Sequence, residues 1–229
     1  MPRISSDAFV FAVMLVLLGA IVPKSALNAA VDLKPDNTRS GYIARLLINE
    51  APFPGEPGWM SESDSKATML SILWVCDNRI DYVPAGYRQA QIATVQTNDI
   101  IEVITAGGEK GQCDGFYRDA SGAFKAVPRV GKRVDYLSRI AGQGPPGKFA
   151  RLLNYAQGLA DSYERGGIPE AERFAGLKTI QKIPVTGRAY SWMTDKDVYH
   201  PGGNYVRIPD SQSGSLGGNR FFTLRRLNP

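Results

Sequence analysis

A glutamate stands at the end of a short apolar stripe early in the chain. The range 41–50 is predicted to form one helix, with Ser40 as its N-cap and Pro52 as its stop, and Glu50 lies in line with three apolar residues at helical spacing. A carboxyl group in that position points toward the core or a cleft, where desolvation raises its pKa. A general acid that works near neutral pH needs a raised pKa. The alternative is a structural glutamate whose carboxylate lies in solvent.

The loop that follows this helix is rich in proline and glycine and carries more acids. Glu56 is predicted to polarise Glu50 or to hydrogen-bond sugar, and the alternative is an acid that only orders the loop or lies in solvent. Trp59 is a candidate for stacking on a sugar ring. Glu62 and Asp64 suit the start of the next helix, where acids are favourable. One of them is the alternative second carboxylate, if the reaction uses water. Acidic and aromatic groups beside a helix end indicate a carbohydrate site.

Aromatic residues also gather in the C-terminal part of the chain. Tyr190 and Trp192 are two residues apart in a segment predicted to be extended, so they share one face. Tyr199, His200 and Tyr205 follow, and with Trp59 these residues form the predicted substrate-binding set. Each aromatic side chain has packing as its alternative role. His200 is expected to be a hydrogen-bonding loop residue and not a catalytic group.

The composition limits the classes of function. The chain has 229 residues and a net charge of +5, which allows one sizeable domain or two small ones. It contains no zinc module, no aromatic RNA-binding segment and no helix-turn-helix pattern, so no nucleic-acid partner is predicted. With a single histidine and two widely spaced cysteines, no metal site and no cofactor are predicted.

The N-terminus carries an uncharged apolar run over residues 8–22. Arg3 precedes the run, and a stretch of small residues over 25–30 follows it, a pattern that resembles a secretory signal peptide. The run is shorter than the ~18–20 residues of a membrane-spanning helix, although an uncleaved membrane anchor is the alternative. We therefore predict an exported envelope protein, with a leader or anchor over 1–30, a linker over 31–40 and a domain over 41–229.

Export changes the interpretation of the two cysteines. In an oxidising compartment Cys76 and Cys113 are candidates for one disulfide that closes a long loop, worth about 3–4 kcal/mol in the chain-entropy model. The alternative is two separate buried thiols.

Periodicity predicts the elements that position these residues. A second helix, capped by Ser63 and Asp64, is apolar nearly all round and should be the buried central helix, and Asn78 near its end either bonds close to Glu50 or caps the helix. The remaining predictions are helices over 89–105 (with a break near 97–98), 130–141 and 149–163, a loop over 109–124, and strands over 180–183, 205–208 and 220–224. The predicted class is mainly α (α+β), with a small C-terminal β element.

Several motifs occur in the order found in one family. The segment 50–57 resembles the Glu-Ala-x-Gly-Glu-Pro signature of the bacterial cell-wall hydrolase family that includes spore-cortex lytic enzymes, with Pro52-Phe53-Pro54 lengthening the spacing. Asn78-Arg79, Gln112-Cys113 and the Gly-Gly-Asn-Arg-Phe-Phe run over 217–222 are similar to later family motifs, with Arg220 where a histidine is usual. The resemblance covers roughly residues 42–226.

This resemblance implies a lysozyme-like single domain in which Glu50 is the general acid. The implied partner is the glycan strand of peptidoglycan, and the reaction is cleavage of the β-1,4 bond between N-acetylmuramic acid and N-acetylglucosamine. Either water or a hydroxyl of the muramic acid itself is the nucleophile, as in muramidases or lytic transglycosylases. By analogy, Asn219 positions the substrate or the C-terminal strand.

Two other classes of function are the alternatives. One is a catalytically inactive, membrane-anchored binding or scaffold protein with the same fold, in which the insertion over 52–54 fills the cleft. The other is a peptidoglycan amidase or peptidase, which lacks support because the sequence offers neither zinc ligands nor a credible Cys-His pair.

Overall fold

The computed structural model describes residues 31–194 and 200–227, so the predicted leader and Tyr199 lie outside the described residues. The helices are α1 (Arg39–Glu50), α2 (Glu62–Asp81), α3 (Gln89–Ala93), α4 (Ile100–Thr105), α5 (Pro128–Ala141) and α6 (Lys148–Glu164), with 3-10 turns at Gly108–Lys110 and Asp210–Gln212. The strands are β1 (Phe116–Arg118), β2 (Phe124–Ala126), β3 (Thr179–Ile180), β4 (Ile183–Pro184), β5 (Ser191–Thr194), β6 (Tyr205–Arg207), β7 (Ser215–Leu216) and β8 (Asn219–Leu224).

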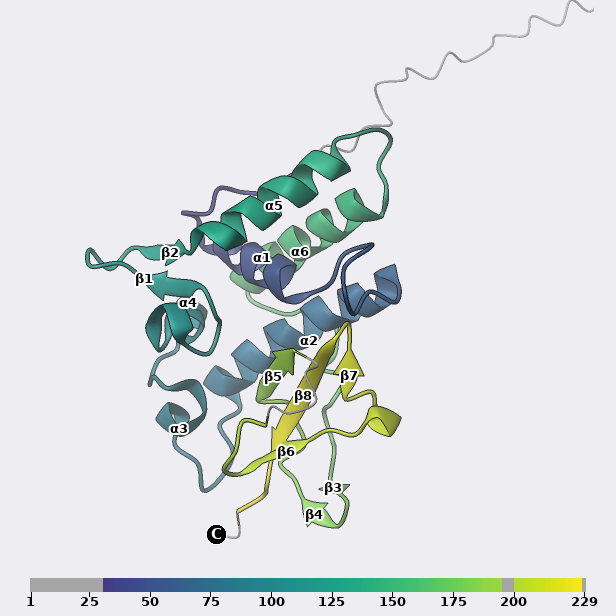
Figure 1. The fold of residues 1–229 in the computed structure, drawn as a ribbon. Coiled ribbons are helices and arrows are strands. Elements are labelled where there is room, and N and C mark those ends of the chain that lie inside the picture. Colours follow the sequence, from purple (N-terminus) through teal and green to yellow (C-terminus); the bar gives the residue numbers. More distant parts are fainter. Residues whose placement is uncertain (1–30, 195–199, 228–229) are drawn as a thin grey trace, which may run out of the picture.

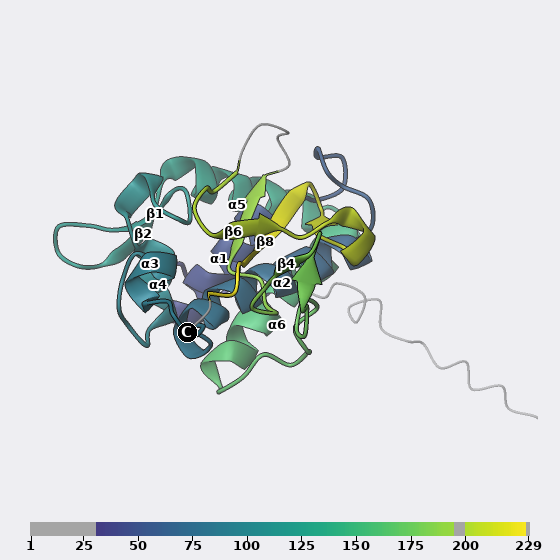
Figure 2. The ribbon, with the colours of Figure 1, turned by 90° about the horizontal axis from the view of Figure 1, so that it is seen from below.

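Helices and strands occupy different sides of the molecule. Helices α1, α5 and α6 pack together, and α2 runs between them and the sheet formed by β5, β8 and β6, with β7 paired to β8 (Figure 1). All pairings in this sheet are antiparallel, and Trp192 of β5 lies opposite Phe221 of β8. The β1–β2 hairpin projects on the side of the molecule opposite to β4 (Figure 2). One apolar core joins α1, α2, α5 and α6 to the sheet.

Helix α1 ends at Glu50, as predicted, because the next residues cannot continue it. Ala51 is extended, with φ −98° and ψ 142°, which is the conformation favoured by a residue that precedes proline. The predicted N-cap is wrong by two residues. Thr38, not Ser40, caps the helix, and its Oγ1 accepts a hydrogen bond of 3.1 Å from the Gly41 amide.

Helix α2 is the buried central helix that the sequence predicts. Its buried residues lie on every side of the helix, because α1, α4, α6 and the sheet all contact it. Its N-cap is Ser61, whose Oγ accepts from the Asp64 amide at 3.1 Å, so the prediction of Ser63 and Asp64 as caps is wrong. The two amphipathic helices predicted over 130–141 and 149–163 are confirmed as α5 and α6.

The predicted class, a mainly α (α+β) lysozyme-like domain whose β element is small and C-terminal, is wrong. The described residues are 42% helical and 14% strand, and antiparallel pairs also occur in the middle of the chain, so the fold is mixed α+β and not mainly α. The range 109–124, predicted as a loop, contains β1 and leads into β2, because an Asp119–Gly122 turn folds Phe116–Arg118 onto Phe124–Ala126. The strand predicted over 180–183 is instead the tight β3–β4 hairpin, with Gln181 and Lys182 at positive φ.

The segment 31–38, predicted as a linker, lies along α6. The Asp32 amide donates to Asn154 at 3.1 Å, the Lys34 amide donates to Gln157 at 3.0 Å, and the Lys34 ammonium pairs with Asp161 at 2.7 Å. Within the described ranges, no helix has both the length and the apolar character needed to cross a membrane.

Candidate functional site

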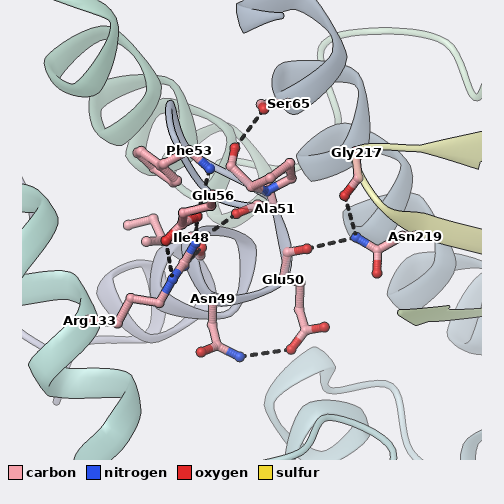
Figure 3. Close-up of polar contacts among 11 residues, drawn as sticks. Ile48, Asn49, Glu50, Ala51, Phe53, Glu56, Ser65, Arg133, Gly217 and Asn219 are labelled. Atoms are coloured by element: carbon pink, nitrogen blue, oxygen red, sulfur yellow. Dashed lines mark hydrogen bonds and ion pairs between the residues drawn. The ribbon is translucent and has the colours of Figure 1, made fainter. Parts of the chain in front are cut away.

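Glu50 projects from the last turn of α1 toward β5 and is only partly exposed. Trp192 Nε1 donates a hydrogen bond of 3.0 Å to its Oε2, and Asn49 Nδ2 donates one of 2.9 Å to its Oε1 (Figure 3 shows the Asn49 contact). The structure therefore brings together Glu50 and Trp192, two predicted site residues that are far apart in the sequence. Both carboxyl oxygens have a fixed donor, so the group has one defined orientation.

The pKa of Glu50 is raised above its ordinary value. Burial is the largest cause, since it disfavours the charged carboxylate, while the hydrogen bonds from Trp192 and Asn49 act in the opposite direction. The effect of desolvation on the pKa is larger than that of the two hydrogen bonds, because the donors replace only part of the hydration that a carboxylate has in water. The carboxyl group can thus hold a proton at a higher pH than an exposed glutamate and release it to a developing charge nearby.

The backbone of Glu50 is held from the sheet by Asn219. Its Nδ2 donates 2.7 Å to the Glu50 carbonyl, one of the carbonyls that a helix end leaves unpaired (Figure 3). Gly217 and Gly218 have φ of 51° and 70° and form the two-residue turn between β7 and β8. A Cβ on Gly217 would lie 2.8 Å from Pro52 Cδ, so only glycine lets the turn approach the end of α1 this closely. Asn219 is therefore a positioning residue.

Arg133 of α5 ties the end of α1 to the loop that follows it. Its guanidinium donates to the Ile48 carbonyl and, at 3.0 Å, to the Ala51 carbonyl (Figure 3). It also forms a bidentate ion pair with Glu56, in which Nε is 3.0 Å from Oε1. Glu56 also accepts from the Phe53 amide at 2.7 Å. A cation at the C-terminal end of a helix is favourable for the helix dipole. Glu56 therefore orders the loop, which is one of its predicted roles, and it has no hydrogen bond to Glu50.

The residues that lengthen the Glu50–Glu56 spacing do not fill the space in front of Glu50. Phe53 is fully buried and packs 6.1 Å from Phe149, centroid to centroid, while its ring lies below the Arg133 guanidinium. Pro52 is fixed by its carbonyl, which accepts 2.6 Å from the Ser65 hydroxyl. The insertion thus adds to the core and leaves the carboxyl group accessible.

Glu50 and Trp192, although hydrogen-bonded to each other, line two different pockets. A pocket of about 260 Å³ is lined by Glu50, Asn49, Arg133, Thr194 and Asn219, together with the loop at 51–57 and the β7–β8 turn. A second pocket, of about 420 Å³, has Trp192 in its wall and extends toward α3 and the loop at 106–112. Trp192 and Tyr205 give the second pocket an aromatic wall, and the Trp192 indole is hydrogen-bonded to Glu50 of the first. A pocket with an aromatic wall and a few placed polar groups suits a sugar ligand.

Most of the other predicted substrate-binding residues lie elsewhere. Tyr190 is buried, and its hydroxyl donates 2.7 Å to the Tyr82 carbonyl. His200 is exposed, and its Nδ1 accepts 2.9 Å from the Gly202 amide, as expected for a loop residue. Trp59 packs partly against the core, and only Tyr205 lines the second pocket with Trp192.

Asn78 and the remaining acids also point away from Glu50. Asn78 Nδ2 donates 2.9 Å to Glu172 and 3.0 Å to the Ala189 carbonyl, so it connects α2 to the chain before β5. Glu62 is paired with Arg151 at 2.7 Å, and this hydrogen-bonded pair lowers the pKa of Glu62 to about 2. Asp64 accepts from the Ser61 hydroxyl at 2.7 Å at the start of α2. Neither acid is hydrogen-bonded to Glu50 or lines its pocket.

The two cysteines lie next to each other in the core as free thiols. Both are buried, and a hydrogen bond between them, together with burial, raises the pKa of Cys113. Their disulfide stays a prediction. Among residues 31–194 and 200–227, no group of three or more histidine, cysteine, aspartate or glutamate side chains is placed to hold a metal ion.

Sequence reasoning missed Asn49 and Arg133. Asn49 directly precedes Glu50, but adjacent residues do not face each other on a helix, so spacing gave no reason to pair their side chains. Arg133 is one of several cations in α5, and no local pattern distinguishes it.

Comparisons of the chain with models of protein families, with curated protein sequences and with solved structures found no match. The resemblance to cell-wall hydrolases therefore rests on the motifs in the sequence.

Proposed function

We propose that this protein is an exported enzyme that cleaves the glycan strands of peptidoglycan, with Glu50 as the acid and base. The observation that carries the proposal is the Glu50 carboxyl group itself. It is partly buried, has a raised pKa, is oriented by Trp192 and Asn49, and lines an open pocket beside the Trp192 indole. The motif resemblance supplies the substrate, because the same glutamate is the acid in that family.

In the proposed reaction, protonated Glu50 donates its proton to the glycosidic oxygen as the bond to the muramic acid carbon breaks. N-acetylglucosamine leaves with a free hydroxyl, and positive charge develops on the muramic acid ring. The Glu50 carboxylate then removes a proton from a hydroxyl of the same muramic acid. That oxygen bonds to the cationic carbon, so the product ends in anhydro-muramic acid and Glu50 regains its proton.

The surroundings of Glu50 favour this internal nucleophile over water. A hydrolase with two carboxylates needs a second, ionised acid that activates water or attacks the sugar. The other described acid in the Glu50 pocket is Glu56, and both of its oxygens are held by Arg133. Lytic transglycosylation requires one carboxyl group, and Glu50 is the described carboxyl group of this pocket that has no ion pair with an arginine.

The inactive scaffold is not favoured by the position of the insertion. That alternative predicts a cleft filled by residues 52–54, whereas Phe53 lies in the core against Phe149 and the Glu50 pocket is open.

The test is solubilisation of purified peptidoglycan by the full chain and by Glu50→Gln. We expect loss of activity by at least a hundredfold in Glu50→Gln, the lower end of the range for removal of a general acid. Glu62→Gln is the matched control, since it makes the same change at the helix start, and we expect it to retain activity. Equal activity of all three proteins would refute Glu50 as the acid. Loss of activity in Glu62→Gln alone would show that Glu62, and not Glu50, is the glutamate that the reaction needs.

A further inference from the structure

The pocket beyond Trp192 contains a buried cation that lacks part of its hydrogen bonding. Arg79, in the last turn of α2, is only 3% exposed, and its Nε donates 2.9 Å to the Tyr190 carbonyl. Its Nη1 is buried and has no hydrogen-bond partner, and none of the ion pairs within the described ranges involves Arg79. The helix end favours a cation here, but it gives Nη1 no acceptor.

The lining of this pocket suits an anion. The pocket has a volume of about 420 Å³, and of the described residues that line it, Arg79 and Lys110 are cations and none is acidic. Gln112 adds a second unmet group, because its Oε1 is buried without a partner while its Nε2 donates 2.5 Å to Thr94. A buried guanidinium nitrogen and a buried amide oxygen left unpaired both cost free energy, which a ligand carrying an anion and a hydrogen-bond donor would recover.

The position of Arg79 limits which anion of the substrate can reach it. The Arg79 guanidinium carbon lies 5.5 Å from the Trp192 ring centroid, and Nε1 of the same indole lies 3.0 Å from Glu50. Acid and cation are thus separated by one side chain, so the anion must be attached close to the bond that Glu50 cleaves.

We infer that this pocket, with Arg79 and Gln112, is a subsite for the lactyl carboxylate of muramic acid, an inference that rests on the proposed function. That carboxylate belongs to the lactyl ether on C3 of the sugar ring, two ring positions from the C1 carbon whose bond is cleaved. In intact peptidoglycan it is bound in an amide to the stem peptide and carries no charge. It becomes an anion when the peptide is removed, so the preferred substrate is a peptide-free glycan strand, and the reaction that supplies it is hydrolysis of the amide between the lactyl group and the peptide.

The experiment measures binding without cleavage, in the full chain with Glu50→Gln. Fluorescently labelled glycan strands of equal length are compared with and without their stem peptides. We expect at least tenfold tighter binding of the peptide-free strands, which corresponds to about 1.4 kcal/mol. A charge-assisted hydrogen bond to a carboxylate accounts for a preference of that size.

The decisive variant is Gln112→Glu, added to Glu50→Gln. Replacing Arg79 would also remove its bond to the Tyr190 carbonyl, whereas Gln112→Glu keeps the side-chain shape and puts a competing carboxylate into the pocket. We expect it to abolish the preference. Gln143→Glu makes the same charge change at an exposed position after α5 and should leave the preference intact.

Three results would overturn the subsite: equal binding of both strand types, binding of neither, or a preference that survives Gln112→Glu. These results are separate from the fate of the proposed function. A chain that cleaves peptidoglycan but binds both strand types equally keeps the function and loses the subsite. If the chain does not cleave peptidoglycan but prefers peptide-free strands, and if Gln112→Glu abolishes that preference, the subsite stands and the proposed enzymatic function is refuted.

Discussion

Replacing Trp192 by phenylalanine should move the pH dependence of the reaction in a defined direction. The indole Nε1 donates 3.0 Å to Glu50 and favours the charged carboxylate, so it holds the pKa of Glu50 below the value that burial alone would give. Trp192→Phe keeps an aromatic ring beside Arg79 but removes the donor. The pKa of Glu50 should therefore rise further.

The size of the shift follows from the strength of the lost bond. A hydrogen bond to a charged acceptor contributes about 1.5 kcal/mol at the lower end of its range, and one pKa unit is about 1.4 kcal/mol. The pKa of Glu50 should rise by about one unit. Because Glu50 acts in its protonated form, activity is lost as the pH rises through this pKa, and the variant should stay active to about one pH unit higher.

The assay is the pH dependence of kcat/KM for release of soluble fragments from peptidoglycan. Trp74→Phe is the matched control, since Trp74 Nε1 donates 2.9 Å to the Glu170 carbonyl, away from the Glu50 pocket. We expect its alkaline limb to stay where it is in the unmodified chain. If the alkaline limb of the pH profile of Trp192→Phe stays in place or moves to lower pH, the proposed effect of the Trp192–Glu50 hydrogen bond is refuted.

Three further predictions concern stability and the thiols. Arg133→Met leaves the carbonyls at the end of α1 without their donor, so it should lower the free energy of unfolding, measured by urea titration, by about 2–4 kcal/mol. The control is Arg139→Met, which removes a cation stacked on a half-exposed tyrosine and should cost under about 1 kcal/mol. Similar losses in the two variants would contradict the role of Arg133 in anchoring the end of α1. Burial raises the pKa of Asp77 from 3.8 to about 6, so its contribution to stability is present below pH 4 and lost as pH rises through 6. Asp77→Asn should therefore increase the free energy of unfolding above pH 6, by at most about 3 kcal/mol. An equal increase at pH 3 would show that the buried charge of Asp77 is not the cause. If the chain is exported, Cys76 and Cys113 should resist alkylation in denaturant until a reductant is added, and immediate labelling of both would rule out the disulfide.

Features governed by local chemistry could be predicted from the sequence. The apolar periodicity of α5 and α6 places both helices within two residues of their observed ends, because an amphipathic stripe is a property of the helix itself. The end of α1 at Glu50 is equally local, since Pro52 forces the preceding residue to be extended. The end of α1 places the candidate acid at the terminus of its helix before any tertiary contact is known.

Features that depend on distant contacts could not be predicted. Arg133 lies far along the chain from the loop that it anchors, and its sequence neighbours give no indication that it points toward Ile48 and Ala51. The β1–β2 hairpin was missed because strands of three residues carry too little alternation to distinguish them from a loop with turn residues. Asn78 is expected from the sequence either to bond close to Glu50 or to cap its helix, but its side chain bonds to Glu172 and Ala189, which lie in a segment with no sequence signal for that contact.

The most direct test of the central claim, that Glu50 cleaves glycan strands by acid catalysis with an internal nucleophile, is mass analysis of the fragments released from purified peptidoglycan. We predict fragments ending in anhydro-muramic acid from the full chain and none from Glu50→Gln. Fragments with reducing ends would contradict the internal nucleophile and require a second carboxylate. Release of the same fragments by both proteins would contradict the assignment of Glu50 itself.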